Sequence, residues 1–155
     1  EREQMVLKIV VGSEHAGAEY RAQLVRDLRD RGMDVTEICE NEILQGYPAV
    51  AEAAARLVTA GKAELGILIC GTGIGMCMAA GKVPGIRAAL CTDSYMGKMA
   101  RRHNNANMLV FGSRVIGYAN MMDILDTFLT ETYEGGRHDA RLAALREVES
   151  RYSKQ

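Results

Sequence analysis

The sequence predicts an α/β fold: a single-domain, Rossmann-like three-layer sandwich with a five-stranded parallel sheet. The length of 155 residues fits one domain. A hydrophobic content of 48% is enough for a sizeable core. Short apolar runs alternate with longer segments of helical periodicity, which is typical of a parallel sheet covered by helices on both faces. Right-handed crossovers make such a sheet doubly wound.

The predicted strands are mostly apolar runs of five or six residues. They are Leu7–Val11, Val35–Cys39, Leu65–Cys70, Arg87–Cys91 and Met108–Gly112. The first is followed by Gly12 and Ser13, and the third runs directly into a glycine-rich turn. We therefore expect the strands to end where polar and small residues begin.

Helical segments separate the strands. Gly32 stops the first helix, Pro48 opens the second and Gly61 ends it. Asp93 or Ser94 caps the fourth. The predicted helices span Gly17–Arg31, Pro48–Ala60, Ile74–Lys82, Asp93–Asn104, Ile116–Thr130 and Asp139–Tyr152. One domain covers residues 1–155, with residues 1–5 expected to fray.

Composition excludes several classes of partner. A net charge of −1 gives no reason to expect nucleic acid or an anionic membrane surface. No apolar run is long enough for a membrane span, and no signal segment is recognisable. The four cysteines, at 39, 70, 77 and 91, show no Cys-x-x-Cys spacing. We interpret three of them as small core residues in a reducing compartment, which makes cytoplasm the default location and disulfides or a metal site unexpected.

The segment Ile67–Gly75 is the most informative part of the chain. A buried strand ends at the thiol of Cys70, and glycines follow at 71, 73 and 75 before a helix begins. A glycine-rich turn of this kind presents several backbone N–H groups to one point, and the helix adds the positive end of its dipole. The pattern therefore predicts an anion hole with a cysteine on its rim.

Ligands of such folds bind beyond the carboxyl ends of the strands, so polar residues there are candidates. They are Ser13–His15, Asn41–Tyr47, Gly71–Thr72, Thr92–Asp93 and Gly112–Arg114. His103 and Asn104 end the fourth helix, at the opposite edge, where they would serve a neighbouring subunit. Taken from the residues alone, Cys70 is equally well a small residue behind the turn. His15, His103 and the arginines at 137 and 141 are equally well solvated residues at helix ends.

Taken together, the motifs resemble the ribose-5-phosphate isomerase B and galactose-6-phosphate isomerase family of sugar-phosphate isomerases. The resemblance runs from about Lys8 to about Glu149. It rests on Gly12–Gly17 (GSEHAG), Ile69–Gly75 (ICGTGIG), Gly85–Ala88 (GIRA), Arg102–Asn107 (RHNNAN), Phe111–Arg114 (FGSR) and Tyr133–His138 (YEGGRH) with Arg141.

The family interconverts an aldose phosphate and its 2-ketose isomer through an enediolate, without a metal. The resemblance therefore implies a sugar-phosphate substrate, no cofactor, and a homodimer or possibly a tetramer. It implies that Cys70 is the base, that Thr72 assists ring opening, and that His103 is the ring-opening acid/base supplied across a dimer interface. The substrate-binding residues it implies are Glu14, His15, Tyr47, Gly71, Gly73, Gly75, Asn104, Arg114, Arg137 and Arg141. Of these, His15 and the three arginines match positions around the phosphate.

The chain departs from the family pattern on the sugar-facing side. Glu14 stands where the family has Asp, and Gly46 stands where it has the Asp of Asp-Tyr-Pro. Gly81 stands where the family often has Asn. A site built around particular hydroxyls discriminates strongly when such partners change. We therefore expect isomerase chemistry on ribose 5-phosphate or on a different C4–C6 sugar phosphate.

Two other functions stay open at this stage. A nucleotide-binding module would use the glycines after the third strand, but the Gly-x-Gly-x-x-Gly spacing and the lysine of a P-loop are lacking. A non-catalytic subunit of a hetero-oligomeric isomerase would keep the fold alone. The presence of Cys70, Thr72 and His103 argues against it.

Overall fold

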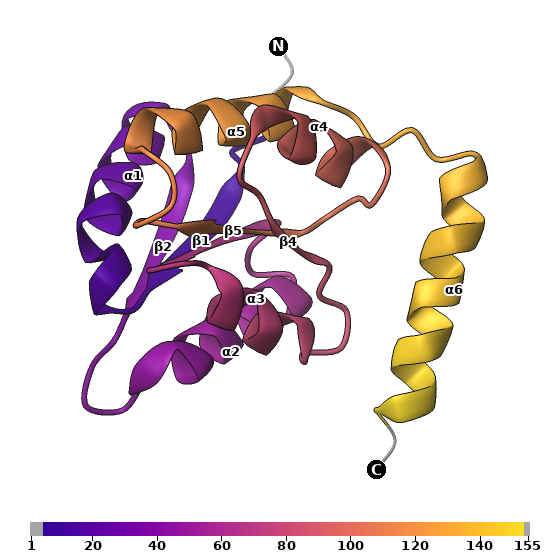
Figure 1. The fold of residues 1–155 in the computed structure, drawn as a ribbon, viewed down its shortest axis with the longest axis horizontal. Helices are drawn as coiled ribbons and strands as arrows, with labels where there is room; N and C mark the ends of the chain where they lie inside the picture. Colours follow the sequence, from indigo (N-terminus) through magenta and orange to yellow (C-terminus); the bar gives the residue numbers. More distant parts are fainter. Residues whose placement is uncertain (1–4, 154–155) are drawn as a thin grey trace.

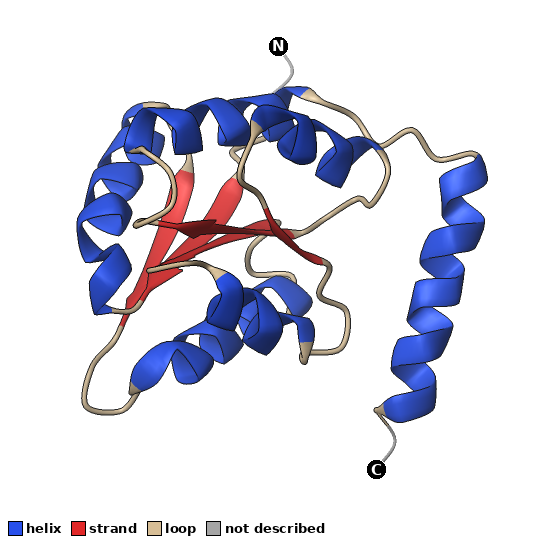
Figure 2. Cartoon of the chain, viewed as in Figure 1, coloured by secondary structure: helices blue, strands red, loops and turns tan. Residues whose placement is uncertain are grey.

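Apolar runs form one parallel sheet in the computed structural model, which describes residues 5–153 (Figures 1 and 2). The strands are β1 (Lys8–Ser13), β2 (Asp34–Cys39), β3 (Leu65–Cys70), β4 (Ala88–Leu90) and β5 (Met108–Gly112). Their order is β2-β1-β3-β5-β4, and all neighbouring pairs are parallel. The predicted α/β fold with a five-stranded parallel sheet is confirmed. The frayed end expected at residues 1–5 lies, except for Met5, outside the described residues.

The helices differ from prediction mainly at their starts. They are α1 (Ala18–Asp30), α2 (Gly46–Thr59), α3 (Ile74–Gly81), α4 (Ser94–Arg102), α5 (Tyr118–Thr130) and α6 (Arg137–Tyr152), with a short 3-10 turn η1 (His15–Gly17). The helix expected from Pro48 begins at Gly46, because the first-turn N–H groups have no helical partner and proline fits there. The last helix begins at Arg137, before the expected Asp139, directly after two glycines of positive φ.

Right-handed crossovers place the helices on the two faces. The connections β1–β2 and β4–β5 run one way along the sheet, so α1 and α4 cover one face, where α5 joins them. The connections β2–β3 and β3–β4 run the other way, so α2 and α3 cover the opposite face (Figure 1). No helix between residues 5 and 153 is long and apolar enough to cross a membrane.

Strand side chains alternate between two separate cores. Ile67 and Ile69 of β3 point to the face of α1, α4 and α5. Leu68 and Cys70 point to the face of α2 and α3. All six residues of β3 are buried, as expected for a central strand of a parallel sheet. The α6 helix stands apart from both layers (Figure 2).

The cysteines correct one prediction. All four are free thiols, but Cys39 is exposed and Cys77 is half-buried, so neither is the small core residue expected. Cys39 ends β2, whose outward positions face solvent because β2 is an edge strand. Only Cys70 and Cys91 are buried.

Two helical glycines give a test of how α4 packs. A Cβ at Gly97 of α4 would lie 2.8 Å from Ile124 Cγ2 and 2.9 Å from Ile124 O on α5, whereas a Cβ at Gly81 of α3 would meet nothing within 4 Å. We expect Gly97→Ala to lower the free energy of unfolding by about 1–3 kcal/mol, because α4 must move off α5. Gly81→Ala should raise it by about 0.4–1 kcal/mol. Urea unfolding of both variants measures this, and equal effects would contradict the close α4–α5 contact.

Candidate active site

A crevice opens at the carboxyl end of β3. The neighbouring strands β1 and β5 are followed by segments on the α1 and α5 face, while β3 is followed by α3 on the other face. Chains that leave adjacent strands toward opposite faces separate from one another, which is where ligands bind in open α/β sheets. Cys70, the last residue of β3, lies at this point.

The turn after β3 wraps around the sulfur of Cys70. The N–H of Gly73 donates to Cys70 Sγ at 3.1 Å. Gly73 has φ of +83°, which favours glycine, and it is the N-cap of α3. The Thr72 hydroxyl accepts from the N–H of Ile74 at 3.2 Å, so its own proton stays available to donate. The thiol therefore lies beside the N–H groups that begin α3, as the sequence predicted.

The end of β5 holds this turn in place. The N–H of Ser113 donates to the Cys70 carbonyl at 2.8 Å, and the N–H of Arg114 donates to the Gly71 carbonyl at 3.0 Å. A Cβ on Gly112 would lie 2.5 Å from the Thr72 carbonyl oxygen. The two segments thus touch through their backbones, with no room for a side chain between them.

The residues around Cys70 line a cavity of about 300 Å³. They are Glu14, His15, Ala16, Tyr47, Cys70, Gly71, Thr72, Gly75 and Arg114. The Tyr47 ring lies against Gly75, where a Cβ would come within 2.7 Å of it. The Arg114 guanidinium lies over Gly71. Most of the predicted site residues that follow β1, β2, β3 and β5 therefore meet in one place.

Glu14 is not free to reach outward. Its Oε1 accepts from the N–H of Ala16 at 2.8 Å and caps η1, and its Oε2 lies 2.9 Å from His15 Nδ1. The Glu14 side chain is 11% exposed and that of His15 is 81% exposed. The carboxylate at position 14 therefore orients the imidazole while the imidazole faces solvent.

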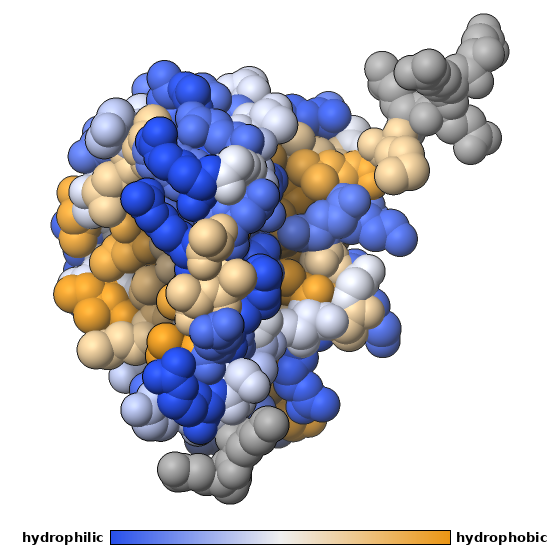
Figure 3. Space-filling model, turned by 90° about the vertical axis from the view of Figure 1, so that its right-hand side faces the viewer, coloured by the Kyte–Doolittle hydropathy of each residue, from blue (hydrophilic) through white to orange (hydrophobic). Residues whose placement is uncertain are grey.

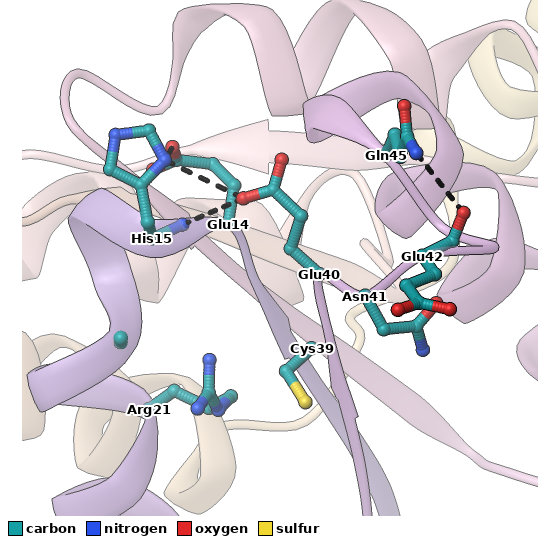
Figure 4. A pocket seen from close by; sticks show the side chains of 9 residues that line it. Glu14, His15, Arg21, Cys39, Glu40, Asn41, Glu42 and Gln45 are labelled. Carbon is teal, nitrogen blue, oxygen red and sulfur yellow. Dashed lines mark hydrogen bonds and ion pairs between the residues drawn. The ribbon is translucent and has the colours of Figure 1, made fainter.

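Glu40 is a residue of this region that sequence reasoning missed. Its Oε1 accepts from the N–H of Gly46 at 2.7 Å. Its Oε2 accepts from the N–H of His15 at 3.3 Å (Figure 4). The Gly46 N–H is the main cause that lowers the pKa of Glu40. The only signal in the sequence was its place directly after β2, one residue before the polar stretch singled out there.

A second cavity of about 670 Å³ adjoins the first and shares Glu14 and His15 with it (Figure 4). Its lining residues are Glu14, His15, Ala18, Arg21, Cys39, Glu40, Asn41, Glu42 and Gln45. Glu40 thus stands between the two walls formed by η1 and the start of α2. It brings a carboxylate to Gly46, where the family pattern would have placed one on the side chain.

The remaining predicted residues lie elsewhere. His103, Asn104, Arg137 and Arg141 do not line the cavity around Cys70. His103 is the C-cap of α4, and its ring stacks on that of His138 at 4.2 Å between centroids. His138 lies in the first turn of α6 between Arg137 and Arg141. The structure therefore divides the predicted site into one group at the β3 end and another where α4 meets α6.

Burial raises the pKa of two other thiols, those of Cys77 and Cys91. Burial raises the pKa of Cys91 to about 12, with Asp93 adding to the shift. Burial also raises the pKa of Cys77. Because a thiolate is the reactive form, neither residue is suited to act as a base or nucleophile near neutral pH.

Between residues 5 and 153, two groups of side chains bring possible metal-ligand atoms within 4.8 Å of one another. One is Glu14, His15 and Glu40, and the other is His103, Glu134 and His138. The two histidine rings of the second group are stacked with an angle of 17° between their planes. The nitrogen lone pairs therefore lie in nearly parallel planes, and the rings would have to rotate for both nitrogens to ligate one ion.

Comparison with known sequences gives consistent results. The sequence profile of the family described as Ribose/Galactose Isomerase matches residues 9–145. The chain is 40% identical to ribose-5-phosphate isomerase B of Escherichia coli K12 over 145 residues, which is 93% of this chain and 97% of the relative. It is also 40% identical to D-erythrulose-4-phosphate isomerase of Pectobacterium atrosepticum over 136 residues, 84% of this chain and 88% of the relative.

Solved structures agree with the fold. The chain superposes on ribose-5-phosphate isomerase B of Clostridium thermocellum with a TM-score of 0.90 and 42% sequence identity, covering 95% of this chain and 100% of the other. The likeness therefore extends over nearly the whole chain.

Proposed function

The chain belongs to the ribose/galactose isomerase family and is an aldose–ketose sugar-phosphate isomerase, and from this premise we propose that Cys70 is its catalytic base. The observation that carries the proposal is the position of Cys70 Sγ, at the carboxyl end of the central strand and 3.1 Å from the N–H of Gly73. That N–H and the start of α3 favour negative charge on sulfur.

The reaction moves protons between two carbons and two oxygens. The Cys70 thiolate removes the proton from C2 of the open-chain aldose, which gives an enediolate, and the proton returns to C1. The hydroxyl proton of O2 is transferred to O1, so the ketose has the same composition. The N–H groups that begin α3 and the Thr72 hydroxyl are placed to donate hydrogen bonds to the charged intermediate. The chemistry needs a free thiol, which fits a reducing cytoplasm.

Replacing the thiol tests the base. We expect Cys70→Ala to lower kcat by about 10²–10⁴-fold, the usual contribution of a general base, with little change in unfolding. Cys39→Ala is the matched control, since it removes an exposed thiol that does not line the Cys70 cavity. A coupled isomerase assay on the purified chain measures both. Near-normal turnover of Cys70→Ala would overturn the assignment, and an inactive unmodified chain would favour the non-catalytic subunit.

We further propose a homodimer whose two sites are each built from both subunits. The chemistry of the family requires a ring-opening group, and His103 does not line the Cys70 cavity of its own chain. Arg137 and Arg141 flank His138, which stacks on His103. A subunit that lends His103 therefore lends these arginines with it, and they suit the phosphate because guanidinium binds phosphate bidentately.

The surface around α6 is suited to a second copy. Leu145, Val148 and Tyr152 of α6 are 54%, 47% and 69% exposed. Figure 3 looks onto the side that carries α6 and shows hydrophobic surface on both sides of a hydrophilic band. Apolar side chains exposed in such number favour an interface between subunits.

Mixing two inactive variants tests shared sites. With ribose 5-phosphate as the substrate, Cys70→Ala and His103→Ala chains should each be inactive alone and regain activity together, since a mixed dimer contains one intact site. With random exchange the recovery should approach about a quarter of wild-type activity per subunit, because half of the dimers are mixed and each has one good site. Subunit exchange is verified with two tags of different mass. Exchange without recovery would contradict the shared site.

We propose that the substrate is a phosphorylated aldose of four to six carbons, with ribose 5-phosphate as the first candidate. The relatives named above are equally identical to this chain and carry the names of a pentose and a tetrose phosphate isomerase. Overall identity therefore does not select the sugar. The residues that face the sugar therefore determine which sugar phosphate is bound. Among them, Glu14 caps its own turn and Glu40 supplies a carboxylate beside Gly46.

A panel of C4–C6 aldose and ketose phosphates tests this. We expect Glu40→Gln to change the ratio of kcat/KM between sugars of different length by at least about fivefold, since a hydrogen bond to a charged group contributes about 1.5–3 kcal/mol. Glu42→Gln is the matched control because Glu42 lines the second cavity, of about 670 Å³, without contacting Gly46 or His15 through its side chain. Equal specificity profiles for both variants would remove Glu40 from substrate selection. Non-phosphorylated sugars should react poorly with all of them.

A further inference from the structure

The connection between α5 and α6 contains Glu134, which contacts the last residue of α4. The N–H of Glu134 donates to the Arg102 carbonyl at 3.0 Å, and Glu134 Oε1 accepts from Arg102 Nε at 2.7 Å. Arg102 is the last residue of α4, directly before His103. Glu134 therefore fixes the end of α4 through both its backbone and one carboxylate oxygen.

The other oxygen of this carboxylate faces two imidazoles. Glu134 Oε2 lies 3.8 Å from His103 Nε2 and 3.4 Å from His138 Nε2. The His138 side chain is 5% exposed, and its Nε2 has no hydrogen-bond partner among the described residues. Because a buried polar atom without a partner is costly, His138 gives the cluster a polar group that only the nearby carboxylate or a bound molecule can satisfy.

We propose that Glu134 is the positioning residue of His103: its carboxylate and the stacked ring of His138 hold the ring-opening imidazole in one orientation. The inference rests on the proposed role of His103. Stacking alone fixes the plane of the His103 ring but leaves its Nε2 free to turn, and the carboxylate at 3.8 Å gives that nitrogen a preferred direction. Small errors in the placement of a reacting group can cost about 10²-fold in rate.

Glu131 provides a matched control on the same connection. It also faces Arg102, with Oε2 3.8 Å from Arg102 Nε, and its side chain is 28% exposed against 32% for Glu134. Within residues 5–153, no ion pair joins Glu131 to either imidazole. Glu131→Ala therefore removes a negative charge near Arg102 and leaves the histidine cluster intact.

Reaction direction separates positioning of His103 from general damage. Ribulose 5-phosphate has no free hydroxyl from which a five-membered ring can close, so it enters the site as an open chain. Ribose 5-phosphate is cyclic and must be opened first. A defect in ring opening therefore slows the aldose direction, while the initial rate from the ketose is kept, because the ring of a released aldose closes without the enzyme.

The experiment measures kcat in both directions for the unmodified protein and for Glu134→Ala, Glu131→Ala and His103→Ala. We expect Glu134→Ala to lower kcat from ribose 5-phosphate by about tenfold or more and to keep kcat from ribulose 5-phosphate within about threefold. Glu131→Ala should match the unmodified enzyme. Circular dichroism and light scattering establish that each variant folds and assembles, and Glu134→Gln, which keeps the side-chain volume, replaces Glu134→Ala if that variant does not fold.

The outcomes separate this inference from the function it rests on. If kcat from ribose 5-phosphate falls in His103→Ala but not in the Glu134 variant, the positioning role alone is overturned. If His103→Ala keeps its kcat from ribose 5-phosphate, the proposed role of His103 is wrong and the positioning role of Glu134 is wrong with it. Equal losses in both directions for the Glu134 variant would make its role structural and would also overturn the inference.

Discussion

The carboxyl ends of β3 and β5 meet through their backbones, and the geometry of the candidate site depends on this contact. A Cβ on Gly112 would lie 2.5 Å from the Thr72 carbonyl oxygen, and Ser113 and Arg114 donate their N–H groups to the carbonyls of Cys70 and Gly71. These bonds hold the turn so that the N–H of Gly73 faces the sulfur. A side chain at position 112 would push β5 away from the turn. The thiol, the N–H groups and Arg114 would then no longer face the same cavity.

The same topology explains why one subunit does not hold the whole proposed site. The α4 helix begins beyond the carboxyl end of β4 and ends at the opposite edge of the sheet, because a crossover helix returns the chain to the start of the next strand. His103, at its far end, is therefore carried away from Cys70. Glu134 and His138 join it there and tie the start of α6 to the end of α4. The proposed dimer brings one such cluster to the glycine turn of the other subunit.

Carboxylates shape the opposite wall of the cavity. Glu14 turns back to cap η1 through one carboxylate oxygen and orients His15 through the other. Glu40 meets the N–H of Gly46, which has φ of +79°, a conformation that glycine adopts without strain. An aspartate placed at 46 would have to adopt that same backbone, so the carboxylate on the loop after β2 is the less strained way to bring negative charge there. The proposed role of Glu40 in substrate selection rests on this exchange of one carboxylate for another.

The sequence by itself determined the alternation of strands and helices, the parallel sheet and the thiol on its glycine turn. These follow from local patterns: apolar runs of strand length, glycines that stop helices, and a glycine at position 73, where the turn has a left-handed backbone conformation. The same alternation placed His103 at the end of the fourth helix, away from Cys70, and the family motifs added its expected role across a dimer interface. Only the tertiary structure decided the strand order β2-β1-β3-β5-β4, the exposure of Cys39 and the contacts of Glu40 and Glu134. The physical reason is that these depend on which segments lie side by side, and the pairing of distant segments leaves no periodic pattern in either of them.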